Sequence, residues 1–180
     1  MKICVISDIH GSTVWKDIVA KEKENVDRFI FLGDYVDDKR KLVSPEEQLQ
    51  NLQSIQDFKK EYIHVDLLIG NHDLQYIGGA RCNRFDSYLF DLVQSEFIAM
   101  VQKEILQVCV CYDNYLFSHA GISYIWMKEK GMEDYTDINK QFHTNPLVLD
   151  FVNKISSDAS GDNVYQSPLW IRPDSLGNSA

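Results

Sequence analysis

An apolar run that ends in a glycine and a cluster of carboxylates constrains this chain more than any other feature. Residues 29–38 read FIFLGDYVDD, so that four apolar side chains and Gly33 precede Asp34, Asp37 and Asp38. Such a run is typical of a strand that is buried on both faces, as in an α/β sheet. Carboxylates crowded at its end need a positive partner, because like charges a few Å apart cannot all stay ionised without one. We expect that partner to be a metal ion.

The same pattern occurs twice more. Two further apolar runs, residues 2–7 and 63–69, lead respectively to Asp8-Ile9-His10 and to Gly70-Asn71-His72-Asp73. Helices are predicted between the runs, over 12–24 and 44–60, and strands that alternate with helices favour a parallel sheet. Ligands bind beyond the carboxyl ends of the strands in such sheets. The three polar clusters are therefore expected to converge.

The chain after this region is predicted to add a helix, a hairpin and a cap. A helix is expected over 86–102, and strands over 105–111 and 115–118 flank Asp113-Asn114, a two-residue connection typical of a type I′ hairpin. The second hairpin strand leads to His119, which adds an imidazole. Residues 122–155 are predicted to form short helices that cap the site. All of 1–180 is expected to be one domain.

Four motifs, in this order and spacing, resemble those of the calcineurin-like metallophosphoesterases. They are Asp8-x-His10, Gly33-Asp34-x-x-Asp37, Gly70-Asn71-His72-Asp73 and His119-Ala120-Gly121. The residues in these motifs are most similar to those of the branch that contains protein serine/threonine phosphatases and symmetrical dinucleoside tetraphosphatases. The resemblance implies an α/β fold in which a β-sandwich is flanked by helices in α-β-β-α layers.

The resemblance also implies a set of site residues and two divalent cations. Asp8, His10 and Asp34 would bind one metal, and Asp34 would bridge to a second metal held by Asn71 and His119. His72 would be the general acid, with Asp37 as the partner of its ring. Mixed oxygen and imidazole ligands favour manganese, iron, zinc or cobalt over calcium, and manganese is our first choice. The implied reaction is attack of a metal-bridging hydroxide on phosphorus.

This sequence departs from the family pattern in two places. Asp38 stands where the protein phosphatases have an arginine that binds phosphate, and Lys39, Arg40 or Arg172 could replace it, with Arg172 preferred. The Gly-His motif that completes the site of the family is missing after Trp170. A fragment of a longer enzyme, a short natural form and a degenerate relative are the alternatives, and we favour the fragment.

Charge and apolar patterning exclude some classes of function. The net charge of −9, from 18 basic and 27 acidic residues, argues against a nucleic-acid-binding surface, which is usually basic. The first residues already read as a strand rather than a signal peptide, and no apolar stretch reaches membrane-spanning length. The four cysteines lack metal-site spacing, which favours reduced side chains in a cytoplasmic protein. The sequence does not predict the oligomeric state.

Two functions remain open, from different classes. One is a phosphoesterase acting on phosphoserine or phosphothreonine proteins or on dinucleoside polyphosphates, and the other is a binding or scaffold protein with an impaired site. A haloacid-dehalogenase-type phosphatase is a weaker alternative, because His10 stands where that mechanism needs an acid. Each candidate also has a structural alternative: strand-end caps for Asp8 and His10, an acidic turn for Asp34 and Asp37, and core packing for His119.

Overall fold

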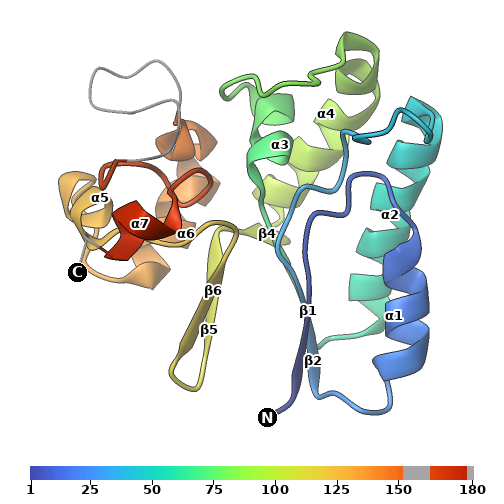
Figure 1. Ribbon diagram of the computed structural model, residues 1–180, viewed down its shortest axis with the longest axis horizontal. Coiled ribbons are helices and arrows are strands. Elements are labelled where there is room, and N and C mark those ends of the chain that lie inside the picture. The colour runs from blue at the N-terminus through green and yellow to red at the C-terminus, as the bar shows by residue number, and fades with distance from the viewer. Residues whose placement is uncertain (152–162, 178–180) are drawn as a thin grey trace.

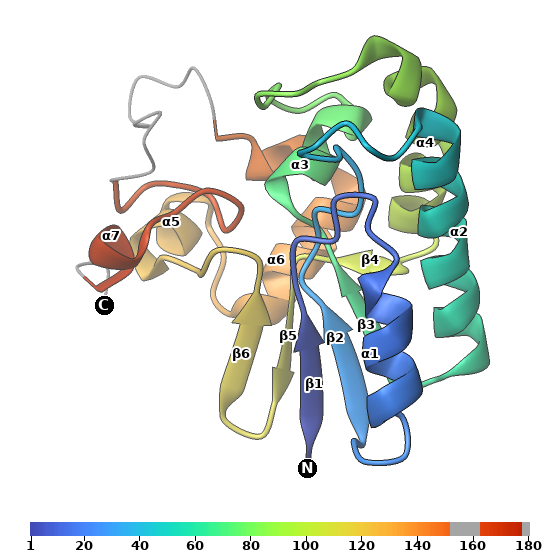
Figure 2. The ribbon, with the colours of Figure 1, turned by 45° about the vertical axis from the view of Figure 1, so that its right-hand side comes forward.

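A four-stranded parallel sheet forms the centre of the computed structural model, which describes residues 1–151 and 163–177. Its strand order follows the chain: β1 (Ile3–Ile6), β2 (Arg28–Phe31), β3 (Val65–Leu68) and β4 (Leu106–Gln107). Ile6 pairs with Phe31, and Phe31 pairs with Leu67, so the first three strands end at the same level. The loops that follow them lie together at that end of the sheet (Figure 2).

Three helices cover one face of this sheet. They are α1 (Val14–Glu22), α2 (Pro45–Glu61) and α4 (Ser87–Gln102). The start of α2 is fixed by a capping box, in which Glu47 N donates to Ser44 Oγ and Ser44 N donates to Glu47 Oε2. Alternate residues of β2, Phe29 and Phe31, pack with these helices in the main core. Burial of this large apolar surface stabilises the layer that carries the site.

The opposite face of the sheet packs against a β-hairpin, as the sandwich prediction requires. The hairpin consists of β5 (Cys109–Tyr112) and β6 (Tyr115–Ser118), and it stands beside the sheet (Figure 1). Ile30, Leu68 and Val110 form a second, much smaller core between the layers. The mixed α/β fold is confirmed, and among the described residues its second sheet consists of the hairpin alone.

Two local predictions in this region are wrong. The run 105–111 is not one strand, because β4 pairs in parallel with β3 and the chain then changes layer before β5. An apolar run gives no signal for this change, since Leu106, Val108 and Cys109 are buried on both sides of it. The hairpin connection has two residues, but only Asp113 has a positive φ, whereas a type I′ turn needs two such residues.

Short helices follow the hairpin, as predicted for the first part of 122–155. They are α5 (Tyr124–Glu129), α6 (Tyr135–Thr144) and the 3-10 turn η2 (Pro146–Leu149), and η2 contacts α3 (Asn71–Leu74). Residues 152–155 lie outside the described residues, and a cap over the site stays a prediction. Near the end, Trp170 stacks on Phe151 with ring centroids 4.9 Å apart, ahead of α7 (Pro173–Gly177). No helix in 1–151 or 163–177 is long and apolar enough to cross a membrane.

Candidate active site

The backbone at the strand ends is unusual at the predicted site residues. Asp8, His10, Asp34 and Asp37 have φ values of 52°, 44°, 57° and 68°, in the left-handed region that residues with a Cβ seldom adopt. Each such conformation has an energetic cost, and clusters of them occur at functional sites. The turn conformations direct these side chains to one place instead of alternating them across the sheet.

Two glycines let the ends of β2 and β3 approach each other. A Cβ on Gly33, whose φ is 98°, would lie 2.2 Å from the backbone nitrogen of Gly70. A Cβ on Gly70 would lie 2.2 Å from Asp34 Oδ1. Any side chain at either position would therefore displace Asp34 or separate the strands.

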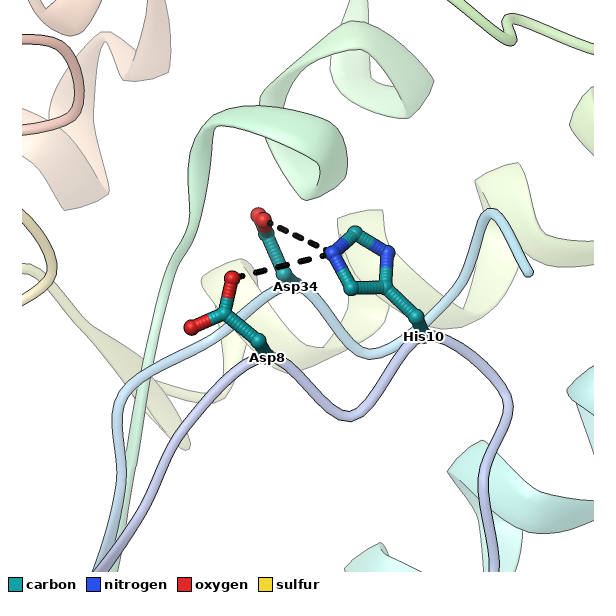
Figure 3. Close-up of side chains that lie close together, drawn as sticks. All are labelled: Asp8, His10 and Asp34. Carbon is teal, nitrogen blue, oxygen red and sulfur yellow. Dashed lines mark ion pairs between the residues drawn. The ribbon is translucent and has the colours of Figure 1, made fainter. Parts of the chain in front are cut away.

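His10 presents one ring nitrogen to two carboxylates. Its Nδ1 lies 3.0 Å from the carbonyl oxygens of Val36 and Asp37, so Nδ1 carries the proton that these acceptors require. The Nε2 lone pair then faces Asp34 Oδ2 at 3.4 Å and Asp8 Oδ1 at 3.7 Å (Figure 3). This nitrogen is buried and has no hydrogen-bond donor. A cation between the three atoms would satisfy all of them, so these residues fit the implied metal.

The ionisation of this group also suits a cation. Burial lowers the pKa of His10, which favours the neutral imidazole that binds metals. Burial opposes ionisation of Asp8, but a hydrogen bond from Ser7 and the charges of His119 and Lys39 give this carboxyl a net lowered pKa. Within the described residues, one group of acidic, histidine or cysteine side chains lies close enough together to hold a metal ion, and it consists of Asp8, His10 and Asp34. We call it the first half-site.

His119 and Asn71 form a second group on the other side of Asp34, which we call the second half-site. His119 Nδ1 lies 2.7 Å from the carbonyl oxygen of Leu32, which orients the ring. Its Nε2 is then 2.8 Å from Asn71 Oδ1 and 3.9 Å from Asp34 Oδ1. Two lone pairs facing each other at 2.8 Å repel unless a proton or a cation lies between them. Asp34 thus presents Oδ2 to the first half-site and Oδ1 to the second.

His72 lies beside the two half-sites with its ring held by a carboxylate. Its Nδ1 is 2.8 Å from Asp37 Oδ2, and its backbone N–H donates to Asp34 Oδ1 at 2.9 Å. The rings of His72 and His10 meet edge to face with centroids 5.1 Å apart. The contact with the carboxylate through Nδ1 orients the ring, and Nε2 is the other ring nitrogen. The roles of His72 and Asp37 in catalysis stay predictions.

Comparison with known proteins identifies the family. The family model for calcineurin-like phosphoesterases matches residues 1–170. The chain belongs to this family. A metallophosphoesterase from Sphaerobacter thermophilus, known from its crystal structure, matches with 22% identity and a TM-score of 0.45. The match covers 67% of this chain and 47% of that protein, so the chain spans about half of its length. A search of curated proteins found no match.

Sequence reasoning missed the residues that hold Asp37 in this calcineurin-like site. Gln75 Nε2 and Tyr76 Oη both donate to the Asp37 carboxylate, and both side chains are fully buried. Gln75 also accepts the backbone N–H of Cys82 at 2.9 Å, and the Asn71 amide donates to Cys82 Sγ at 3.3 Å. One hydrogen-bond network therefore joins Asn71, a candidate metal ligand, to Asp37. The available signal was spacing, since Gln75 and Tyr76 follow Asn71 and His72 by one helical turn.

Two acids beside the site have structural roles. Asp73 is fully buried and accepts hydrogen bonds from the backbone N–H groups of Gly70, Asp34 and Tyr35, which ties the ends of β2 and β3 together. Asp38 accepts from the N–H groups of Arg40, Leu42 and Val43 and so shapes the loop after β2. Burial is outweighed there by these backbone donors, which lower the pKa of Asp38.

The candidates for phosphate contact lie in different surroundings. Lys39 Nζ is 3.8 Å from Asp8 Oδ1, at the edge of the first half-site. The Arg172 guanidinium stacks over the Trp170 ring at 4.6 Å. The preference for Arg172 as the phosphate contact stays a prediction, and Lys39 contacts the proposed metal ligand Asp8.

Proposed function

We propose that this protein is a metal-dependent phosphoesterase with two divalent cations, manganese being the first choice and iron, zinc or cobalt the alternatives. The observation that carries the proposal is the position of Asp34, whose two carboxylate oxygens face two different groups of ligand atoms. Asp8 and His10 would complete one group, and Asn71 and His119 the other. When bound, such a metal pair activates water and polarises the phosphoryl oxygens.

The residues around the metals would perform the rest of the reaction. His10 and His119 are oriented by backbone carbonyl groups, which fixes the direction of their lone pairs. His72 would donate a proton to the leaving oxygen, and Asp37 would keep the ring protonated and in place. Gln75 and Tyr76 hold that carboxylate, so that it cannot turn away from His72. The closed backbone around Gly33 and Gly70 keeps these groups in register.

The substrate is proposed to be a phosphoserine or phosphothreonine protein or a dinucleoside polyphosphate. This follows from the motif resemblance to the branch of the family that contains protein phosphatases and symmetrical dinucleoside tetraphosphatases. Both reactions transfer a phosphoryl group to water, and they differ in whether an alkoxide or a phosphate leaves. The same acid, His72, would serve either leaving group.

Hydrolysis of p-nitrophenyl phosphate by the purified chain tests the proposal. We expect activity that manganese stimulates and a chelator removes. Asp34→Asn should lower kcat/KM by about 10³-fold, because one substitution weakens both half-sites. Asp57→Asn, an exposed carboxylate on α2 paired with Lys60, is the matched control and should keep full activity. Hydrolysis that persists with chelator and in Asp34→Asn would refute the proposed function.

A second candidate function is a binding or scaffold protein that keeps this fold with an impaired site. One observation favours it: the second half-site has Asp34, Asn71 and His119 as its ligands within the described residues, one imidazole fewer than the family pattern implies. This candidate predicts one bound metal and no turnover of phosphoesters. Two fully occupied metals together with turnover would exclude it.

A further inference from the structure

A cleft of about 720 Å³ opens beside the first half-site and continues away from it. Asp8 and His10 are among the residues that line it. The other walls come from residues 11–14 and Lys16, from residues 38–40, 42 and 43, and from the side of α2 that carries Gln50 and Ser54. The volume is in the range of small-molecule sites in proteins. A substrate held at the metals would therefore have room for a further group in this cleft.

Cationic side chains line the cleft in a chain whose net charge is −9. Lys39 is next to Asp8, as described above, and Arg40 follows it on the same loop. On the facing wall, Lys16 Nζ lies 3.5 Å from Ser54 Oγ. Positive charge on both walls favours an anionic occupant, since opposite charges at short range attract even in partly solvated surroundings.

Three carboxylates, Asp8, Asp38 and Glu47, line the cleft beside the three cationic side chains. Asp8 belongs to the first half-site, where the proposed metal would neutralise it. Asp38 accepts three backbone N–H groups, and Glu47 accepts the backbone N–H of Ser44 in the capping box. Each acid is therefore partly compensated by peptide donors and turned into its own loop. The cleft also contains the first residues of α1, where Val14 N–H donates to Ser12 Oγ at 3.3 Å and the Thr13 side chain makes no cap hydrogen bond. The positive end of this helix dipole adds to the field in the cleft.

We propose that this cleft binds the phosphate chain of a polyphosphorylated substrate, so that a scissile phosphoryl group at the metals is followed by at least one more phosphate between Lys16 and Arg40. Lys16, Lys39 and Arg40, together with the hydroxyl group of Thr13 and the amide of Gln50, supply hydrogen-bond donors for the oxygens of a phosphate chain. This inference rests on the proposed function and narrows its substrate class to phosphoanhydrides.

The corresponding reaction is hydrolysis of a phosphoanhydride. The oxygen of a water molecule bonds to the scissile phosphorus, and the water releases one proton. The bridging P–O bond breaks, and its electron pair goes to the leaving phosphate chain, which takes a proton from His72. Lys16 and Arg40 would hold the chain that leaves and balance its growing charge.

Binding of inorganic tripolyphosphate to the metal-free protein, measured by calorimetry, tests the cleft without requiring turnover. We expect saturable binding that weakens about tenfold in Lys16→Ala and in Arg40→Ala, since each loses a charged hydrogen-bond donor. Both side chains are exposed, so the variants should fold. Lys21→Ala, on the same helix as Lys16 but outside the cleft lining, is the matched control and should bind as the parent protein does. Absence of binding, or equal weakening in the control, would overturn the inference.

Kinetics with manganese then separate this inference from the proposed function. The ratio of kcat/KM for tripolyphosphate to kcat/KM for p-nitrophenyl phosphate should fall about tenfold in Lys16→Ala and Arg40→Ala and stay constant in Lys21→Ala. If both substrates are hydrolysed and this ratio is unchanged in the variants, the proposed binding of a phosphate chain in the cleft is rejected, and the proposed phosphoesterase function still stands. A different outcome is that Lys16→Ala and Arg40→Ala lower kcat/KM for an acidic phosphopeptide and leave kcat/KM for tripolyphosphate unchanged. That result would show that the cleft binds phosphoprotein and would also reject the inference.

Discussion

The residues of the two half-sites come from different parts of the fold. Asp8, His10 and Asp34 all follow β1 and β2, adjacent strands that are hydrogen-bonded in parallel register. The second half-site combines Asp34 with Asn71 from the start of α3 and with His119, which follows β6 in the other layer. A hydrogen-bonded ladder thus fixes the first group, whereas the second needs two layers to dock correctly.

This difference predicts unequal metal affinities. The small core of Ile30, Leu68 and Val110 and the hydrogen bond from His119 to Leu32 hold the hairpin near the second half-site. The first half-site is supported by the main core under α1, α2 and α4. We therefore expect the first metal to bind more tightly than the second, and the following substitutions test that order.

The largest effect is expected from His72, and it would distinguish the proposed general acid from the proposed metal ligands of both half-sites. His72→Asn should lower turnover on substrates with poor leaving groups by about 10²–10⁴-fold, because it removes the proposed proton donor. The ligands of both half-sites are unchanged, so metal content per chain should stay that of the parent protein. Activity on p-nitrophenyl phosphate, whose leaving group needs little protonation, should fall less. Equal losses on both substrates would assign His72 to metal or phosphate binding instead.

Removal of one imidazole from each half-site tests the comparison directly. His10→Ala should weaken the tighter metal by more than about 100-fold, and His119→Ala should abolish the weaker one while the tighter metal remains. Metal titration of both variants, followed by elemental analysis after gel filtration, measures this. If His119→Ala loses both metals and His10→Ala loses neither, the second half-site is the stronger one.

The sequence predicted which polar residues of the two half-sites come together, and it predicted less of their surroundings. Asp8, His10, Asp34 and Asn71 follow parallel strands, whose carboxyl ends meet at one edge of the sheet. His119 follows a strand of the antiparallel hairpin, and its place beside them came from the motif resemblance. Gln75 and Tyr76 were missed although their helical spacing was a signal, and the contact of Cys82 with Asn71 could not be predicted, since it depends on the path of the chain after α3. The change of layer after β4 was also missed, because a buried strand in either sheet has the same apolar pattern.

A smaller effect is expected from the residues that orient the acid. Gln75→Leu removes the amide that donates to Asp37 and accepts from Cys82, and it should reduce kcat by about tenfold. The loss should be larger for poor leaving groups than for p-nitrophenyl phosphate, which a general loss of stability would not produce. Tyr76→Phe, which removes the other donor to Asp37, should show the same dependence on leaving group. Uniform losses on all substrates would make Gln75 a packing residue only.

The smallest effect should come from loosening the contact between the layers. Val110→Ala removes two methyl groups from the small core and should cost about 1–2 kcal/mol of unfolding free energy. Because the hairpin carries His119, the second metal should also bind about two- to fivefold more weakly, with the first metal unaffected. Val65→Ala, a matched truncation in the main core, should cost similar stability without this selectivity. Calorimetric metal titrations of the two variants compare them, and an equal change at both metals in Val110→Ala would mean that the hairpin does not set the second affinity.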